Sequence, residues 1–177
     1  MKVIAIAAVT AGGKTTAVNE ITRRLPNAQS LHFDAYQFEG EVGDFYRWVQ
    51  NGADYNVWNL APLEKDIIKI MGEGNCDYLI LDYPFAYCNT QIEKYIDLAF
   101  FINTPLDIAL TRRILRDMGD ASGDEIRNNL RGYLDYERVA YVQMLGDILP
   151  SSDYVVDGTG SRETVVENII NIIKYEI

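Results

Sequence analysis

The residue types most suited to chemistry in this chain lie in a glycine-containing turn near the N-terminus. Residues 8–16 read Ala-Val-Thr-Ala-Gly-Gly-Lys-Thr-Thr and fit the phosphate-binding pattern GxxxxGK[ST] except at the first glycine, which is Ala8. Backbone N–H groups of such a loop surround a phosphate, its lysine bridges the terminal phosphates, and its hydroxyl holds Mg²⁺. The alternative is a tight turn that only happens to precede a helix. The predicted phosphate-binding residues are Thr10, Ala11, Gly12, Gly13, Lys14, Thr15 and Thr16.

Carboxylates follow two predicted strands at the point where each strand ends. Asp34 comes after a short strand at 30–33, and Asp82 comes after a strand at 78–81. Ligands of an open α/β sheet collect at this edge. Phosphoryl transfer to a hydroxyl needs one carboxylate to accept the proton and another to steady a metal ion. Either residue alone is as readily a loop residue or a helix cap, but beside a phosphate loop we interpret both as functional.

Arginines gather on one predicted helix, at Arg112, Arg113 and Arg116. Spacings of three and four place Arg116 on a shared face with each of the other two. A small, polar, glycine-bearing segment follows, which is typical of a mobile lid over phosphates. An arginine on a transferring phosphoryl group accelerates comparable reactions by roughly 10³ to 10⁵. The alternative is a solvated helix face paired with Asp107 and Asp117.

Apolar runs of strand length, separated by amphipathic stretches, must position these residues. Strands are predicted at 3–9, 30–33, 78–81, 98–102 and 154–156. Helices are predicted at 14–25, 44–50, 62–71, from Thr104-Pro105 to near Gly119, from Ser122 to about Leu145, and at 161–174. Thr104 is expected to cap its helix, and Ser122 with Glu125 forms a capping box. Continuously apolar strands imply a parallel sheet covered on both faces, so the fold class is α/β with five parallel strands.

Composition restricts the partners of the chain. It has 177 residues and a net charge of −10, which argues against a nucleic-acid polymer or an anionic membrane surface. One histidine and two cysteines are too few for a zinc knuckle or a disulfide framework. No apolar run approaches the roughly 20 residues of a membrane span, and the run at 3–9 leads into glycines and a lysine instead of a cleavage site. We therefore expect one domain in the cytoplasm.

Several segments together resemble the uridine kinase, nicotinamide riboside kinase and phosphoribulokinase family of P-loop kinases, over nearly the whole chain. IAIAAVTAGGKTT is similar to the family's first strand and phosphate loop, and LHFDAYQFE to the segment with its catalytic aspartate. LILDYPFAY is similar to its strand with an acidic end, ALTRRILRD to its lid helix, and YVVDGTGSRETV to the ending of nicotinamide riboside kinases. The resemblance implies a three-layer P-loop NTPase fold over 1–177, with a substrate-side insert at about 34–59 and a lid at about 112–127.

The resemblance also implies roles for individual residues. Asp34 would be the general base, and Asp82 would hold Mg²⁺ together with Thr15. Further catalytic residues would be Lys14, Arg112 and Arg116, and Arg113 would join the phosphate loop in binding ATP. The residues implied at the acceptor are Tyr36, Asp54, Phe85 and Tyr87.

The chain departs from the family pattern at several positions. Ala8 replaces the first loop glycine, and Tyr83 stands where the family usually has glycine. A second lid arginine has no counterpart at 119–124, and His32 lies inside a strand, away from the place of the histidine that uridine kinases set against the base. These departures leave ATP chemistry intact and make uridine itself a weaker candidate acceptor.

Two functions are compatible with these residues. The first is an ATP- and Mg²⁺-dependent kinase that phosphorylates a hydroxyl of a small nucleoside-like metabolite. The second is a non-catalytic nucleotide-binding protein that acts as a switch for a partner. A switch needs Lys14 and Thr15 but no proton acceptor, so Asp34 favours the kinase. The aromatic residues between Phe33 and Trp58 fit a ring-stacking surface or the cover of a small core, and a homo-oligomer stays open because apolar stripes serve a core equally.

Overall fold

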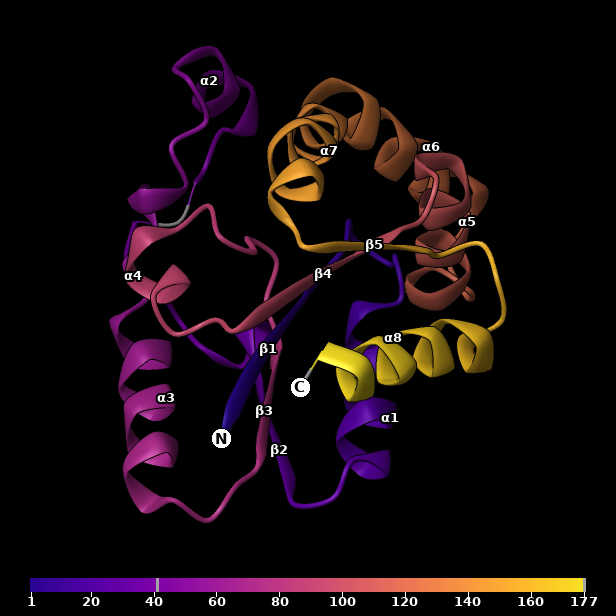
Figure 1. Cartoon of the computed structure of the whole chain (residues 1–177). Coiled ribbons are helices and arrows are strands. Elements are labelled where there is room, and N and C mark those ends of the chain that lie inside the picture. Colours follow the sequence, from indigo (N-terminus) through magenta and orange to yellow (C-terminus); the bar gives the residue numbers. More distant parts are fainter. Residues whose placement is uncertain (41, 177) are drawn as a thin grey trace.

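The computed structural model describes residues 1–40 and 42–176. Its centre is a five-stranded sheet in the order β2-β3-β1-β4-β5, with every neighbouring pair parallel (Figure 1). The strands are β1 (Lys2–Ala7), β2 (Ala28–His32), β3 (Tyr78–Asp82), β4 (Leu98–Asn103) and β5 (Tyr154–Asp157). The predicted α/β class with five parallel strands is confirmed.

Helices cover both faces of this sheet (Figure 1). They are α1 (Lys14–Arg24), α2 (Phe45–Gln50), α3 (Ala61–Glu73), α4 (Thr90–Glu93), α5 (Leu106–Asp117), α6 (Gly123–Gly132), α7 (Arg138–Ser151) and α8 (Arg162–Glu176). Short turns of other helical types are η1 (Phe33–Ala35), η2 (Tyr55–Val57) and η3 (Tyr133–Glu137), the last of which is π-helical. None of the described helices combines the length and apolar character that crossing a membrane requires.

The two faces of the sheet bury separate cores because successive strand residues point to opposite sides. Val3, Ala5 and Ala7 of β1 pack on the side of α3, α4 and α7, whereas Ile4 and Ile6 pack on the side of α1 and α8. All five side chains are almost completely buried. This double burial explains why the strand is apolar at every position, and it gives the three-layer architecture.

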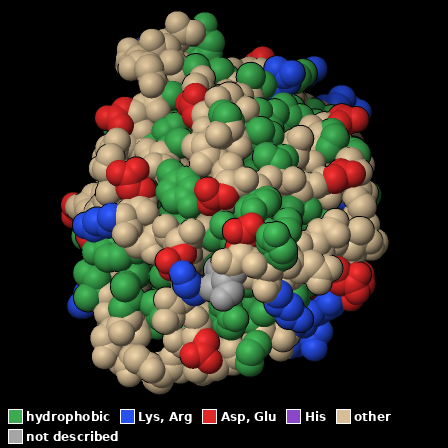
Figure 2. All heavy atoms as spheres, viewed as in Figure 1, with side chains coloured by type: hydrophobic (Ala, Val, Ile, Leu, Met, Phe, Trp, Pro, Cys, Tyr) green, Lys and Arg blue, Asp and Glu red, His purple; other side chains and the backbone are tan. Residues whose placement is uncertain are grey.

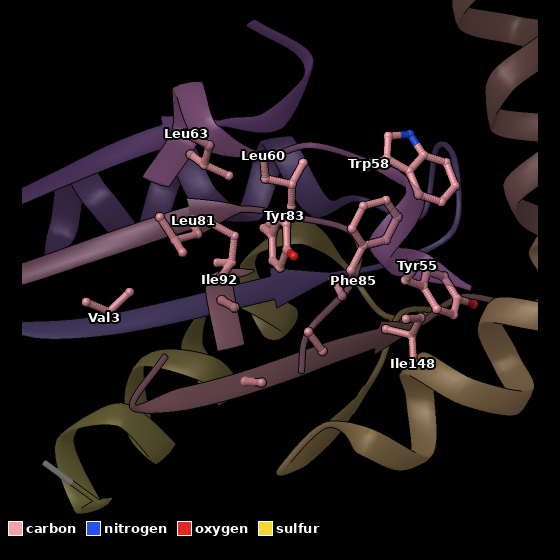
Figure 3. Close-up of a cluster of buried hydrophobic side chains, with 14 of the residues drawn as sticks. Val3, Tyr55, Trp58, Leu60, Leu63, Leu81, Tyr83, Phe85, Ile92 and Ile148 are labelled. Carbon is pink, nitrogen blue, oxygen red and sulfur yellow. The ribbon is translucent and has the colours of Figure 1, made fainter. Parts of the chain in front are cut away.

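The first of these cores is rich in aromatic rings toward one end of the sheet. Figure 3 shows Phe85 between Tyr55 and Trp58, with Tyr55 facing Ile148 of α7. The centroid of the Phe85 ring lies 5.4 Å from that of Tyr55 and 4.9 Å from that of Trp58. Rings of the segments 34–40 and 42–59 thus pack into this core. On the face drawn in Figure 2, acidic side chains lie scattered among hydrophobic and basic ones.

Two local predictions are corrected. Thr104 does not cap α5, which begins after Pro105 without a side-chain cap; its hydroxyl is buried and donates to the carbonyl oxygen of Gly12 at 2.9 Å. The helix predicted from Ser122 to about Leu145 keeps its capping box but is interrupted by η3 and continues to Ser151. The spacing of apolar residues does not reveal a π turn, since the apolar pattern continues on both sides of it.

The strand order determines which loops and strand ends lie together at one edge of the sheet. β1 lies between β3 and β4, so the chain reverses its direction of winding beside β1, where ligands of such sheets bind. The phosphate loop after β1, Asp82 at the end of β3, η1 after β2 and Thr104 after β4 therefore meet at one edge.

Candidate active site

The loop after β1 has the backbone geometry that encloses a phosphate. Ala11 and Gly13 have positive φ angles of 51° and 100°, a conformation in which successive N–H groups curve round an anion. A Cβ at Gly12 would lie 2.8 Å from the Val9 carbonyl oxygen and 2.9 Å from the Ala8 Cβ. The methyl group of Ala8 is therefore accommodated because Gly12 has no side chain, and the departure at Ala8 leaves the loop intact.

The N-terminus of α1 completes this loop. Gly13 is its N-cap and offers no side-chain hydrogen bond to the first turn. The first N–H groups of a helix have no partner within the helix, and they carry the positive end of its dipole. The loop and this first turn line a cavity of about 610 Å³ together with arginines from other elements. Charge, N–H donors and volume all fit the phosphates of ATP, and we name this space the nucleotide cavity.

Lys14 is held by a buried acidic partner. Its Nζ forms an ion pair with Asp82, whose side chain is 2% exposed. The second oxygen of Asp82 lies 3.0 Å from Nδ1 of His32 at the end of β2. Burial by itself raises the pKa of Asp82, but the charge of Lys14 and hydrogen bonds with Lys14, His32 and Thr15 outweigh it, so the pKa is lowered. Asp82 is consequently an anion beside the Thr15 hydroxyl.

This pair of oxygens fits one hard cation. Mg²⁺ is usually held through one or two carboxylates while phosphate oxygens and water complete the octahedron. Thr15 and Asp82 supply a hydroxyl and a carboxylate, a donor set that suits Mg²⁺ bound together with a nucleotide. The described residues contain no cluster of three or more His, Cys, Asp or Glu that could hold a metal ion.

Asp34 lies where two cavities adjoin. It belongs to η1 and lines both the nucleotide cavity and a second cavity of about 410 Å³. Its carboxylate makes no side-chain hydrogen bond or ion pair within the described part of the chain. Phe33, Pro84, Tyr141 and Met144 also line both spaces. A carboxylate without a partner at this junction is able to accept a proton.

The lid-helix arginines divide into two groups. Arg112 and Arg116 line the nucleotide cavity; Arg112 donates to the Gly158 carbonyl oxygen at 3.2 Å, and Arg116 pairs with Asp117 at 2.6 Å. The hydrogen bond with Asp117, and to a lesser extent the charge of Asp34, raises the pKa of Arg116. Helical spacing of four residues presents these two guanidinium groups on one face.

Arg113 points elsewhere, which corrects its predicted place at the nucleotide. One residue along a helix turns the side chain by about 100°, and Arg113 is buried between α5, α6 and η3. It forms an ion pair with Glu137 and donates to Asn129 at 3.0 Å. Its guanidinium also lies 5.4 Å from the centroid of the Tyr133 ring.

The second cavity is mainly aromatic, and we name it the acceptor cavity for the role proposed below. Phe85, which the resemblance places at the acceptor, lines this cavity with rings from the 34–59 segment. The described residues that line it are Phe33, Asp34, Val42, Phe45, Trp48, Tyr55, Trp58, Pro84, Phe85, Glu137, Ala140, Tyr141 and Met144.

Three residues predicted to contact the acceptor lie outside both cavities, which corrects their placement. Tyr36 donates to Asp66 at 2.9 Å and packs on Phe38. Asp54 caps η2 by accepting from the Asn56 N–H at 2.9 Å. Tyr87 donates to Asp153 at 2.6 Å. Each polar group is engaged by a neighbour within the fold.

Sequence reasoning missed several residues of the site. Arg162 at the start of α8 lines the nucleotide cavity, and Thr104 supports the phosphate loop. Both follow strand ends, the same signal that identified Asp34 and Asp82. Tyr141, Met144 and Glu137 carried no comparable signal, since they lie inside a helical pattern.

Comparison with known proteins agrees with this geometry. No protein-family profile matches the chain. The chain is 23% identical to the uridine kinase of Borrelia hermsii (strain HS1 / DAH), over 92% of this chain and 89% of that protein. It is 19% identical to uridine-cytidine kinase B of Dictyostelium discoideum, over 99% and 82% of the two chains.

A solved structure has a similar fold. Shikimate kinase from Aquifex aeolicus vf5 superposes with a TM-score of 0.53 at 18% identity, covering 99% of this chain and 98% of that one. At this identity the likeness shows the fold alone. The chain is thus similar to uridine kinases over most of its length, which confirms the resemblance predicted from the sequence.

Proposed function

We propose that this protein is an ATP- and Mg²⁺-dependent kinase that transfers the γ-phosphoryl group to a hydroxyl of a small nucleoside-like acceptor. The position of Asp34 carries the proposal, because it lies on the shared wall of a phosphate-binding cavity and an aromatic cavity. A hydroxyl presented from the aromatic side reaches the carboxylate and the phosphate side together. The similarity to uridine kinases supports the nucleoside class of acceptor.

Each residue of the two cavities has a role that follows from its chemistry. Asp34 accepts the acceptor's proton, while Lys14, Arg112 and Arg116 stabilise negative charge on the phosphoryl group. Thr15 and Asp82 hold Mg²⁺, which neutralises phosphate charge when bound. Phe85 and its neighbouring rings bind the acceptor by stacking, worth about 0.5–1.5 kcal/mol for an aromatic pair.

The chain organisation follows from these roles. We propose one kinase domain over residues 1–177, in which the segment at about 34–59 forms the acceptor side. The segment at about 112–127, at the end of α5 and the start of α6, acts as the lid. A cytoplasmic location suits an enzyme that draws on ATP and a small metabolite.

An ADP-release assay tests the proposal. Purified protein with Mg·ATP is offered uridine, cytidine, other ribonucleosides and simple sugars, and the Asp34→Asn protein serves as the catalytic control. Turnover with at least one acceptor is expected, lower by roughly 10² to 10⁴ in Asp34→Asn because general-base catalysis is worth that factor. Asp77→Asn, at an exposed residue just before β3 that lines neither cavity, is the matched control and should keep full activity.

Two results would count against the proposal. Full activity of Asp34→Asn would remove the base assignment. No ADP release with any acceptor, while Mg·ATP still raises the melting temperature, would instead favour the nucleotide-binding switch.

A further inference from the structure

The charged side chains of the acceptor cavity all have one sign. Among its described lining residues only Asp34 and Glu137 are charged, and both are acidic. No lysine, arginine or histidine stands among these lining residues. An acceptor with a carboxylate or phosphate would therefore find no basic side chain among these lining residues to pair with, which is unfavourable in a largely apolar space.

Glu137 reaches this cavity because of the π turn η3. A π turn contains an additional residue within a helix, and such turns are frequent at functional sites. Glu137 is the last residue of η3 and the first before α7. Its side chain is 36% exposed, in contrast to the 10% of its partner Arg113.

Arg113 holds the carboxylate of Glu137 in place through an ion pair. It pairs through Nη1 with Oε2 of Glu137, and its other terminal nitrogen donates to Asn129. Burial lowers the pKa of Arg113, but the hydrogen bond and charge of Glu137 raise it overall, so the pair is ionic. Oε1 of Glu137 has no hydrogen bond within the described part of the chain. One oxygen therefore positions the group, and the other is available to a ligand.

We infer, building on the proposed kinase function, that Glu137 is a specificity-determining residue. Its Oε1 accepts a hydrogen bond from an N–H or O–H of an uncharged or cationic, ring-bearing acceptor stacked in the aromatic cavity. The negative charge of Glu137 excludes acceptors that carry a carboxylate or a phosphate. Asp34 then acts on the hydroxyl that is phosphorylated, and Glu137 selects which molecule presents it.

Calorimetric binding without nucleotide tests this role apart from turnover. The probes are uridine, cytidine and orotidine, which is uridine with a carboxylate on the ring. The wild-type protein should bind uridine or cytidine and discriminate against orotidine. Glu137→Gln should weaken binding of the uncharged probe by about 10- to 100-fold, the range for a hydrogen bond to a charged group. It should also reduce discrimination against orotidine by tenfold or more.

Two further variants separate recognition from folding. Asp135→Asn makes the same change of charge in η3 at an exposed residue that lines neither cavity, and it should bind as the wild type does. Arg113→Met combined with Glu137→Gln removes both charges of the ion pair, so it should restore the melting temperature that Glu137→Gln lowers. Acceptor binding should stay weak in this double variant.

The inference is overturned by any of three results. These are recovery of acceptor affinity in the double variant, a change of less than twofold in Glu137→Gln, and failure of the wild type to bind either uncharged nucleoside. Binding with the expected Glu137 dependence but no ADP release would refute the kinase and leave the specificity role standing.

Discussion

The nucleotide cavity and the acceptor cavity are built in different ways. The first is lined by one continuous run, 8–17, together with residues from other elements such as Arg112 and Arg116 on one helix face. The second has no more than two consecutive residues in any part of its described lining, which extends from Phe33 to Met144. The phosphate loop of the first cavity is set by local backbone geometry, whereas the second cavity is set by tertiary packing. The proposed phosphate binding is thus local in this chain, and the proposed acceptor recognition depends on the whole fold.

Removing a ring from the acceptor cavity should have the largest effect. Trp48 is 8% exposed, and its ring centroid lies 5.0 Å from that of Tyr55 and 5.5 Å from that of Trp58. Trp48→Ala should lower the free energy of unfolding by about 3–5 kcal/mol and weaken acceptor binding. Urea unfolding measures the first, and Mg·ATP should still raise the melting temperature. Tyr46→Ala, exposed on the same helix, is the control; loss of the Mg·ATP response in Trp48→Ala would show that the two cavities are not independent.

A smaller effect is expected on the nucleotide side. Thr104→Val keeps the shape of the side chain but leaves the Gly12 carbonyl without its buried donor. The free energy of unfolding should fall by about 1–3 kcal/mol, and Mg·ATP should bind more weakly by calorimetry. Thr111→Val removes an exposed hydroxyl that bonds to the Asp107 carbonyl and should change neither quantity. Unaltered Mg·ATP affinity in Thr104→Val would show that the loop keeps its shape without this bond.

The free energy of unfolding should depend on pH through Glu64 of α3. Hydrogen bonds from Lys94, Gln91 and Tyr95 lower the pKa of Glu64 from 4.5 to about 2. Because the folded pKa is the lower one, this stabilisation is present above about pH 4.5 and is lost as the pH falls toward 2. Glu64→Gln should therefore flatten the decline in unfolding free energy between about pH 4.5 and 2.5, followed by urea unfolding. Glu73→Gln on the same helix should leave the wild-type slope, and an equal slope in Glu64→Gln would contradict the assignment.

The smallest effect should be a gain in stability. The hydroxyl of Tyr83 is buried, with no hydrogen-bond partner among the described residues. Tyr83→Phe removes this unsatisfied group and should raise the free energy of unfolding by about 0.5–1 kcal/mol. A chemical denaturation series measures the change. A loss of stability would show that the hydroxyl has a partner.

Sequence patterns predicted the nucleotide side more fully than the acceptor side, for the same physical reason. The loop at 8–16 and the capping box at Ser122 depend on neighbours within a few residues, so their spacing alone predicts them. Arg113 and Asp54 were predicted to contact ligands, but their polar groups bond to neighbours within the fold. A sequence does not tell which face of a helix a side chain lies on, or which turn it caps. The sequence does not indicate a role for Glu137, because it lines a cavity only through the π turn and the packing of α5.

The ion pair between Lys14 and Asp82 also affects the affinity for nucleotide. Since Lys14 already has an anionic partner, an incoming phosphate competes with a carboxylate for the same ammonium group. The binding free energy then reflects the difference between two ion pairs, and the Lys14 side chain is 13% exposed before the ligand arrives. Affinity for nucleotide in this sense depends on an exchange of the anion that pairs with Lys14, after which the Asp82 carboxylate is released for another partner.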